Sequence, residues 1–390
     1  MSHRSVFSDE TVLDIHFIPS TLLHRDPEVR FLQNLFKFII ETPYEMSQRA
    51  VIVGPVGSGK TALANWFGRD LEKRAAERRV RARYVHINCR ESRSSLFMVL
   101  NKAVRKLRPN FPDRGFSANE LLDTLMSVLD EDDAQMILCL DEVDAVIEKE
   151  GGDALYNLTR VQEERLEGPR RLNLICISKD PEAFQRLDRS TLSTLQRNVI
   201  RMSEYTQPQL VDILIARAEA SYRTGAISEE IIDFIGDLAA SENGDARYAI
   251  DLLWRSGKYA DTGYSQEVLP EHVRKGAATL FPTLKSEEIR RLSRHEQLVL
   301  LGIAHHFRHS REPQATTGEV ETSYQVACEE HGEEPRGHTQ FWKYLNTLKG
   351  LDVVKIRLSA SERGRTQLIS LPKVPAEELE RVVTRILEAA

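Results

Sequence analysis

The chain has 390 residues, which is enough for two or three domains with sizeable hydrophobic cores. Its 41% apolar and 29% charged residues exclude a disordered or fibrous chain. With 53 basic and 59 acidic residues the formal net charge is −6, so any binding to nucleic acid has to use local basic surfaces. The start has no apolar stretch typical of a signal peptide, and no run reaches the ~20 apolar residues of a membrane span. We therefore expect a cytoplasmic protein without membrane segments.

Short apolar runs alternate with helical patterns in the first half of the chain. The runs predict four buried strands, at Ala50–Val53, Tyr84–Cys89, Met136–Leu140 and Leu172–Ile177. The helical patterns between them include Thr61–Arg74 and Asn119–Leu129, whose leucines fall on one face. Apolar strands joined by helices predict an α/β fold in which a parallel sheet carries helices on both faces.

From about Tyr205 onward the strand signal disappears. Three helices are predicted, at Gln207–Tyr222, Ser228–Glu242 and Ala246–Ala260, so residues 206–282 form an all-α domain after an α/β domain at 1–205. Residues 283–390 show three more helices and two strands, at Arg294–Phe307, Thr317–His331, His338–Lys349, Asp352–Leu358 and Thr366–Leu371. Three helices followed by a hairpin with its turn at Ser359–Arg365 predict a C-terminal winged-helix domain.

A phosphate-binding loop is predicted at Gly54–Thr61, which reads G-x-x-x-x-G-K-T between a strand and a helix. The glycines let backbone N–H groups point at phosphate oxygens, and the helix N-terminus adds a positive dipole. Lys60 would reach the β- and γ-phosphates, and the Thr61 hydroxyl would bind Mg²⁺. The alternative, a chance glycine-rich turn, is disfavoured because both flanks fit. The residues expected to bind nucleotide here are Val56, Gly57, Ser58, Gly59, Lys60, Thr61 and Ala62.

A second acidic motif, MILCLDEVD at Met136–Asp144, ends a buried strand with adjacent carboxylates. Strand ends of a parallel sheet meet at one edge, so this motif would lie beside the phosphate loop. Asp141 would hold Mg²⁺, and Glu142 would orient and deprotonate the attacking water. A solvated acidic loop is the alternative interpretation. Together the two motifs predict a P-loop nucleotidase that uses ATP or ADP with Mg²⁺.

Several further motifs, in order along nearly the whole chain, make the sequence resemble one family. They are Val6–Asp14 (VFSDETVLD), His24–Asp26 (HRD), Leu138–Ala145 (LCLDEVDA), Glu204–Leu210 (EYTQPQL), Gly244–Leu253 (GDARYAIDLL) and Gly364–Thr366 (GRT). The chain resembles the archaeal replication initiators related to origin recognition complex subunits and the cell-division-cycle helicase loader, within the AAA+ ATPases. The resemblance implies an AAA+ base at 1–205, a lid at 206–282 and a winged helix at 283–390.

The resemblance also implies roles for single residues. Tyr205 and Arg217 match nucleotide contacts at the lid junction, and Arg247 matches the sensor arginine that reads the γ-phosphate, so the implied catalytic set is Glu142, Lys60 and Arg247. Two positions depart from the family pattern: Lys179 replaces an asparagine, and Ser190 stands where an arginine is supplied to a neighbouring subunit. Arginine fingers contribute orders of magnitude to rate, so we expect slow or absent turnover.

Three segments are candidates for contact with DNA. Arg108–Ser117 matches the family's insertion, a helical element that enters the minor groove, with Arg114, Gly115 and Phe116 as its contacts; alternatively its phenylalanines pack a loop onto the core. In the winged helix the candidates are Thr339, Gln340 and Lys343 on the helix, and Arg363 and Arg365 at the wing tip. Arg69–Arg108 has 13 basic and four acidic residues, for which a solvated helical face is the simplest interpretation.

The function that best fits these features is that of an ATP- or ADP-binding replication initiator. It would bind double-stranded origin DNA and help recruit the replicative helicase, with other initiator paralogues as further partners and the nucleoid as its location; the recruitment is implied by the resemblance alone. Two alternatives remain open. One is a hydrolysis-defective DNA-binding regulatory paralogue, and the other is an AAA+ signalling ATPase whose winged helix binds protein.

Overall fold

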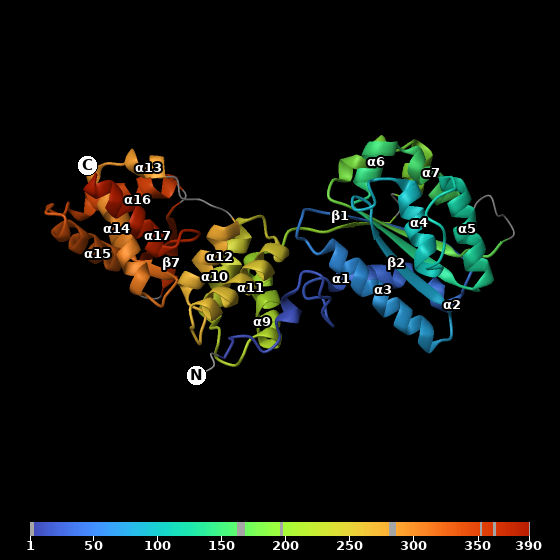
Figure 1. Ribbon diagram of the computed structural model, residues 1–390, viewed down its shortest axis with the longest axis horizontal. Coiled ribbons are helices and arrows are strands. Elements are labelled where there is room, and N and C mark those ends of the chain that lie inside the picture. Colours follow the sequence, from blue (N-terminus) through green and yellow to red (C-terminus); the bar gives the residue numbers. More distant parts are fainter. Residues whose placement is uncertain are drawn as a thin grey trace. The chain divides into compact units, whose positions relative to one another are not determined.

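The structure is a computed structural model that describes residues 4–161, 168–195, 198–280, 286–351, 353–361 and 364–389. The chain forms two compact units (Figure 1). One, the base unit, is Ile18–Tyr205. The other, the C-terminal unit, contains everything from Thr206 onward together with the segment that ends at Phe17. Within the described ranges no helix is long and apolar enough to cross a membrane.

The base unit is built on a five-stranded sheet of order β2-β3-β4-β1-β5, in which every pairing is parallel. The strands are β1 (Arg49–Val53), β2 (Ala82–Asn88), β3 (Gln135–Asp141), β4 (Leu172–Ser178) and β5 (Val199–Arg201). Every residue of β3 and β4 is buried, as continuous apolar strands require when helices cover both faces. The predicted parallel sheet is thus confirmed. Strand β5 was not predicted, because three residues leave too short a pattern.

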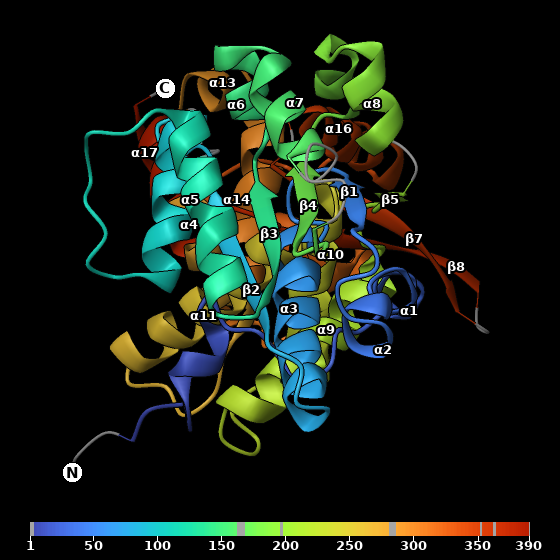
Figure 2. The same ribbon diagram turned by 90° about the vertical axis from the view of Figure 1, so that its right-hand side faces the viewer.

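Helices cover both faces of this sheet (Figure 2). One core is formed with α1 (Asp26–Leu35), α2 (Phe38–Glu41) and α3 (Lys60–Glu77). The other is formed with α4 (Leu96–Leu107) and α5 (Ala118–Glu131), and it continues into α6 (Asp144–Glu150), α7 (Asp153–Arg160), η2 (Pro181–Arg186) and α8 (Arg189–Leu195). The alternation along each strand decides which side chains enter which core, since neighbours on a strand point to opposite faces.

The first part of the C-terminal unit is helical, with α9 (Gln207–Ser221), α10 (Glu229–Ser241), α11 (Ala246–Thr262) and α12 (Pro270–Leu280). The first three were predicted; α12 was not. A short helix near the N-terminus, η1 (Glu10–Leu13), packs against α9 and α11. Phe7 pairs with Tyr222, their ring centroids lying 4.7 Å apart. This segment therefore packs with the lid helices, whereas we had expected it in the domain at 1–205.

The winged-helix part contains α13 (Ser286–Arg290), α14 (Arg294–His309), β6 (Gln314–Thr316), α15 (Thr317–Glu330), α16 (His338–Gly350), β7 (Lys355–Ser361), β8 (Gly364–Ser370) and α17 (Ala376–Glu388). Its antiparallel sheet has the order β6-β8-β7. The expected hairpin is present, but the turn predicted over Ser359–Arg365 is wrong. The strands pair as far as Ser361 and Gly364, because main-chain pairing continues through polar residues that carry no apolar alternation.

Candidate nucleotide site and nucleic-acid surfaces

The phosphate loop leads from β1 directly into α3, as its motif predicts. Gly57 and Gly59 have φ angles of 76° and 89°, a left-handed backbone that side chains disfavour. A Cβ at Gly59 would lie 2.8 Å from the hydroxyl of Tyr205, so glycine is required there for space as well. The loop therefore leaves the N–H groups at the start of an 18-residue helix available to an anion.

The Lys60 amine folds back over its own loop. Its Nζ donates to the carbonyls of Gly54 at 2.7 Å and Pro55 at 2.6 Å, and the Ser58 hydroxyl donates to Pro55 at 2.9 Å. Phosphate oxygens would offer the same amine stronger, charged acceptors in place of these carbonyls. Val56 at the tip of the loop is 57% exposed, while Ala62 is half-buried in the first turn of α3.

Asp141 is buried at the end of β3 and is held by three hydrogen bonds. Its Oδ2 accepts from the Thr61 hydroxyl at 2.7 Å and contacts His86 Nε2 at 3.0 Å, while its Oδ1 accepts from the Glu142 N–H at 2.9 Å. Burial alone would raise the pKa of this carboxyl, but the bonds from His86 and Thr61 outweigh it and the pKa lies below its ordinary value. Asp141 is therefore ionised at neutral pH.

The pair formed by Thr61 and Asp141 suits Mg²⁺. A hydroxyl and a carboxylate are hard oxygen ligands, and Mg²⁺ bound with nucleotide usually takes only one or two protein ligands plus phosphate oxygens and water. Across the described residues no group of three or more His, Cys, Asp and Glu side chains could cage a metal ion alone. These residues thus fit an ion that arrives with a nucleotide better than a permanently resident one.

Glu142, the expected general base, follows Asp141 with a φ of 53°, in the left-handed region. Its carboxylate lies 3.3 Å from Arg90 Nε, and its side chain is 41% exposed. A non-glycine residue in this conformation is strained, and such strain is often found at functional positions. The ion pair with Arg90 engages the carboxylate that would have to take a proton from water. Arg90 was not predicted as a site residue.

Arg25 is a second residue that sequence reasoning missed. It is 4% exposed, donates through Nη2 to the carbonyls of Ser58 at 2.8 Å and Ser203 at 2.9 Å, and donates through Nε to the Tyr205 hydroxyl at 3.0 Å. Its guanidinium also lies 4.0 Å from the centre of the Tyr205 ring. Arg25 therefore ties the phosphate loop to the end of the base unit. The HRD motif at His24–Asp26 pointed to this position, but the sequence does not show which residues Arg25 contacts.

The sequence singled out two further positions, Lys179 and Ser190. Strand β4 lies between β3 and β1, and it ends at Ser178, so the exposed Lys179 follows at the same sheet edge as Asp141 and the phosphate loop. Ser190 lies in the first turn of α8, directly after Arg189, and accepts a hydrogen bond from Arg160. Neither side chain supplies what an asparagine or a finger arginine would supply.

The two predicted lid residues belong to the C-terminal unit. Arg217 is buried and donates to the carbonyls of Val12 at 2.7 Å and Phe17 at 3.2 Å, and burial lowers its pKa. It therefore anchors the N-terminal segment, a role that the motif did not reveal. Arg247 is exposed in the first turn of α11, where its backbone N–H donates to the capping residue Asp245 at 2.7 Å.

The insertion at residues 108–117 is a loop, and the expected helical element is wrong. It connects the end of α4 at Leu107 to the start of α5 at Ala118, and two prolines and Gly115 interrupt any helix in it. Phe111 and Phe116 contact each other, with centroids 4.9 Å apart, and both pack against the core. This is the packing that the alternative interpretation describes, and it leaves Phe116 half-buried. Contact of this loop with DNA stays a prediction. Arg114 and Gly115 are exposed.

The winged-helix candidates lie mostly on α16. Thr339, Gln340 and Lys343 are exposed, while Phe341, Leu345 and Leu348 hold the opposite side in the core. The helix contains no acidic residue, in contrast to α15, which has four glutamates and no lysine or arginine. Arg363 lies outside the described residues. Arg365 stands in β8 at the tip of the hairpin, opposite Ala360.

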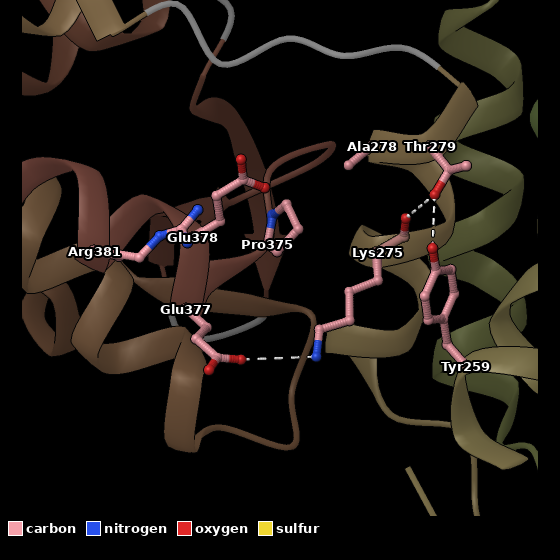
Figure 3. Close-up of a pocket in the computed structure, with 8 residues that line it drawn as sticks. All are labelled: Tyr259, Lys275, Ala278, Thr279, Pro375, Glu377, Glu378 and Arg381. Atoms are coloured by element: carbon pink, nitrogen blue, oxygen red, sulfur yellow. Dashed lines mark hydrogen bonds and ion pairs between the residues drawn. The ribbon is translucent and has the colours of Figure 1, made fainter. Parts of the chain in front are cut away.

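A cavity of about 480 Å³ lies within the C-terminal unit, between α11 and α12 on one side and α17 on the other (Figure 3). Lys275 and Glu377 face each other across it at 3.8 Å. Its other lining residues are Tyr259, Ala278, Thr279, Pro375, Glu378 and Arg381. None of these is a predicted site residue, and the balance of acidic and basic groups favours no single charge of ligand.

Comparison with known families divides the chain in the same order as the fold. An AAA domain model matches residues 47–187, a Cdc6 AAA+ ATPase-type lid domain matches 211–278, and the C-terminal winged helix domain of CDC6 matches 287–382. The ORC1-type DNA replication protein 2 of Sulfurisphaera tokodaii is 33% identical over 387 residues, covering 97% of this chain and 92% of that protein. The chain belongs to the ORC1/Cdc6 family of replication proteins.

Solved structures of ORC1/Cdc6 proteins agree with this assignment. The crystal structure of Cdc6p from Pyrobaculum aerophilum has a TM-score of 0.84 and 33% identity, with 99% of each chain covered. The Aeropyrum pernix ORC1 protein in complex with DNA has a TM-score of 0.65 and 29% identity over 98% of this chain and 97% of its own. The A. pernix ORC2 protein, solved as ADPNP–ADP complexes, has a TM-score of 0.65 and 25% identity, with 98% of each chain covered.

Proposed function

We propose that this ORC1/Cdc6-family AAA+ protein is an ATP- or ADP-binding replication initiator that binds duplex origin DNA and helps recruit the replicative helicase. The nucleotide part rests on one observation: Lys60, Thr61 and Asp141 stand together around a loop whose glycines leave its N–H groups available to an anion. The DNA part is supported by the acid-free exposed face of α16 and by the A. pernix ORC1 relative, which was solved with DNA.

In this proposal each residue at the strand ends has a separate task. The loop N–H groups and Lys60 bind the phosphates, and Thr61 with Asp141 would hold Mg²⁺, which supplies positive charge to the phosphate oxygens when bound. Arg25 holds the loop in position by joining the Ser58 carbonyl to the Tyr205 hydroxyl. Glu142 orients the attacking water once its carboxylate separates from Arg90. Arg247 from the lid reads the γ-phosphate.

The surroundings of Glu142 favour slow hydrolysis. Its carboxylate is paired with Arg90, Lys179 replaces a neutral amide at the adjacent strand end, and no arginine stands at Ser190. A carboxylate held in an ion pair has to break that contact before it can accept a proton from water. These observations favour one second candidate function, a DNA-binding regulatory paralogue that holds nucleotide without turning it over.

Two measurements test the proposal and its alternatives. Binding of duplex DNA to the full chain separates an initiator or a regulatory paralogue from a signalling ATPase whose winged helix binds protein. Phosphate release in a single turnover then separates the initiator from the silent paralogue. Failure to bind any duplex would overturn the initiator function, while DNA binding with no phosphate released would favour the paralogue. Recruitment of the helicase, contacts with other initiators and a nucleoid-associated cytoplasmic location stay predictions.

A further inference from the structure

Two groups of basic side chains in the base unit differ in how many ion pairs they form. Around the ends of α4 and α5, Arg105 pairs with Asp113, and Arg108 donates to both oxygens of Asp132 at 2.8 Å. Arg171 is held in the same way by Asp130 at 2.7 Å and by a second aspartate at 3.0 Å. This group of charges is internally compensated.

The second group, which we call the α3–β2 cluster, lies where α3 ends and β2 begins. It consists of Lys73, Arg78, Arg79, Arg81 and Arg83, all five of them exposed. Within the described part of the chain none of them forms an ion pair with a carboxylate; Arg81 donates to the main-chain carbonyl of Asp132 at 2.7 Å. Between Lys73 and Arg83 the sequence has one acidic residue, Glu77. Asp132 and Asp133 lie near enough to Arg81 and Arg83 to offset part of their charge, so the excess of positive charge is greatest at Arg78 and Arg79 on the turn.

The turn that ends α3 fixes the backbone of two of these arginines. The N–H of Arg79 donates to Ala76 at 3.0 Å and that of Val80 to Ala75 at 2.9 Å, while Arg79 has a φ of 61°. This is a Schellman motif, whose left-handed position is usually glycine. A side chain there costs about 1 kcal/mol. Arg79 thus stands at a position of the turn where glycine would adopt the left-handed backbone at a lower conformational free energy.

The cluster is remote from the nucleotide site. Helix α3 starts at the phosphate loop and ends 18 residues later, a length of roughly 27 Å at 1.5 Å per residue. The phosphate loop follows the carboxyl end of β1, whereas the cluster lies at the amino end of β2. Because the strands are parallel, the two lie at opposite ends of the strands of the sheet (Figure 2). The charge of the cluster therefore has no part in holding nucleotide.

The composition of the cluster favours a phosphate backbone over a protein partner. The large apolar side chains that are exposed lie elsewhere, and none falls between residues 69 and 84. Protein interfaces need buried aromatic or aliphatic anchors at their centre, with charge at the rim. A phosphate backbone needs none, because cations that replace its counterions are sufficient. Like charges within the ~8 Å Debye length also repel one another, a cost that a polyanion removes.

We propose that the α3–β2 cluster binds the phosphate backbone of duplex DNA as a sequence-independent contact on the base unit, separate from the winged-helix surface. The inference rests on the proposed function, since it requires that the chain binds duplex DNA. Guanidinium forks pair well with phosphate oxygens, and such contacts position a protein on DNA without reading its sequence.

The test is a salt titration of duplex binding by the full chain, measured by fluorescence anisotropy. The cluster variant combines Arg78→Gln with Arg79→Gly. Its log–log salt slope should fall by about two units, one for each lost phosphate contact, and by the same amount on every duplex sequence. Glycine suits the left-handed position, so the unfolding temperature of the variant should not fall and lost binding cannot be attributed to misfolding.

A matched control removes the same charge elsewhere on the base unit, by Arg30→Gln with Arg186→Gln, both at exposed positions. An equal fall of slope in the control would overturn the cluster as a specific contact. An unchanged slope in the cluster variant, with a lowered slope in Lys343→Gln, would overturn the cluster while leaving DNA binding intact. If the unmodified chain binds no duplex even at low salt, both the cluster and the proposed function fail.

Discussion

The nucleotide end of the base sheet and the exposed face of α16 differ in how far their polar side chains are buried and held by hydrogen bonds. At the sheet edge, Asp141 is buried and makes three hydrogen bonds, and Lys60 donates to the carbonyls of Gly54 and Pro55. On α16, Thr339, Gln340 and Lys343 stand in solvent. A preassembled site concentrates its binding energy in a few groups, whereas an exposed charged face spreads it over many weak contacts. Single substitutions should therefore have large effects at the first and small ones at the second.

The C-terminal unit also has buried polar groups, but these join its parts. Arg274 is fully buried, donates to the Leu371 carbonyl at 2.9 Å and lies 4.6 Å from the Phe307 ring centre. Burial lowers its pKa to about 10. A buried charge in this chain is thus not sufficient to indicate a ligand site. The groups that it contacts show whether it supports a site or joins two elements. Arg25 holds a phosphate loop, whereas Arg274 holds helix α12 to the winged helix.

The largest effect is expected from Lys60→Ala at the nucleotide end. The variant loses the two charge-assisted bonds that the Lys60 amine would donate to phosphate oxygens, at about 1.5–3 kcal/mol each. The affinity for ATP and ADP should therefore fall by about a hundredfold or more. Equilibrium binding of fluorescent nucleotide measures this, and the unfolding temperature without nucleotide serves as the control. A folded variant with unchanged affinity would contradict the assigned nucleotide site. It would also mean that the sheet edge does not concentrate its binding energy in a few groups.

Arg274→Ala should be the strongest destabilising change in the C-terminal unit. Removing the buried guanidinium leaves the Leu371 carbonyl without its donor, and leaves the Glu271 carboxylate with only the bond from the Ala376 N–H, a loss of about 3–5 kcal/mol. Denaturant unfolding followed by fluorescence measures it, with nucleotide affinity of the base unit unchanged. Arg274→Met, which fills the volume, should lose less. Equal loss in both variants would mean that the polar partners contribute little.

A pH dependence of stability is expected from His272. Burial, with Lys275 nearby, lowers its pKa from 6.5 to about 4, and its neutral Nδ1 accepts from the Leu269 N–H at 3.0 Å. The unfolded chain takes up a proton here below pH 6.5 and the folded chain does not. The stabilisation is therefore complete above pH 6.5 and is lost as pH falls toward 4. His272→Gln keeps an acceptor that does not titrate, so its unfolding temperature should fall less over this range.

The smallest effect is expected on α16. Lys343→Gln should lower the salt slope of duplex binding by about one unit and weaken binding evenly across sequences, since a lysine contributes a point charge. Thr339→Ala with Gln340→Ala should leave that slope unchanged and alter the preference between duplexes. The measurements are anisotropy titrations with two duplexes of different sequence. A hundredfold loss from Lys343→Gln alone would break the comparison, because it would place one dominant contact on an exposed face.

Local patterns in the sequence were sufficient for the elements of the nucleotide site. The glycines and lysine of Gly54–Thr61 predict a turn between a strand and a helix, and Met136–Asp144 predicts a buried strand that ends in carboxylates. Both motifs act through neighbours in the chain and through the rule that parallel strands end at one edge. Apolar spacing predicted α9, α10, α11, α14, α15 and α16 but missed α12, α13 and α17. Short elements such as β5 and β6 carry too few residues for such a pattern.

Only the tertiary structure decided which distant groups meet. Nothing local tells that Arg25 reaches Ser58 and Tyr205, or that His86 contacts Asp141, because these pairs depend on the sheet order β2-β3-β4-β1-β5. The loop at residues 108–117 was expected to be helical on resemblance, yet its phenylalanines pack on the core and its prolines prevent a helix. Periodicity determines which face of an element is apolar. The partner of that face, and of each buried charge, is set by how all the elements together bury their surface.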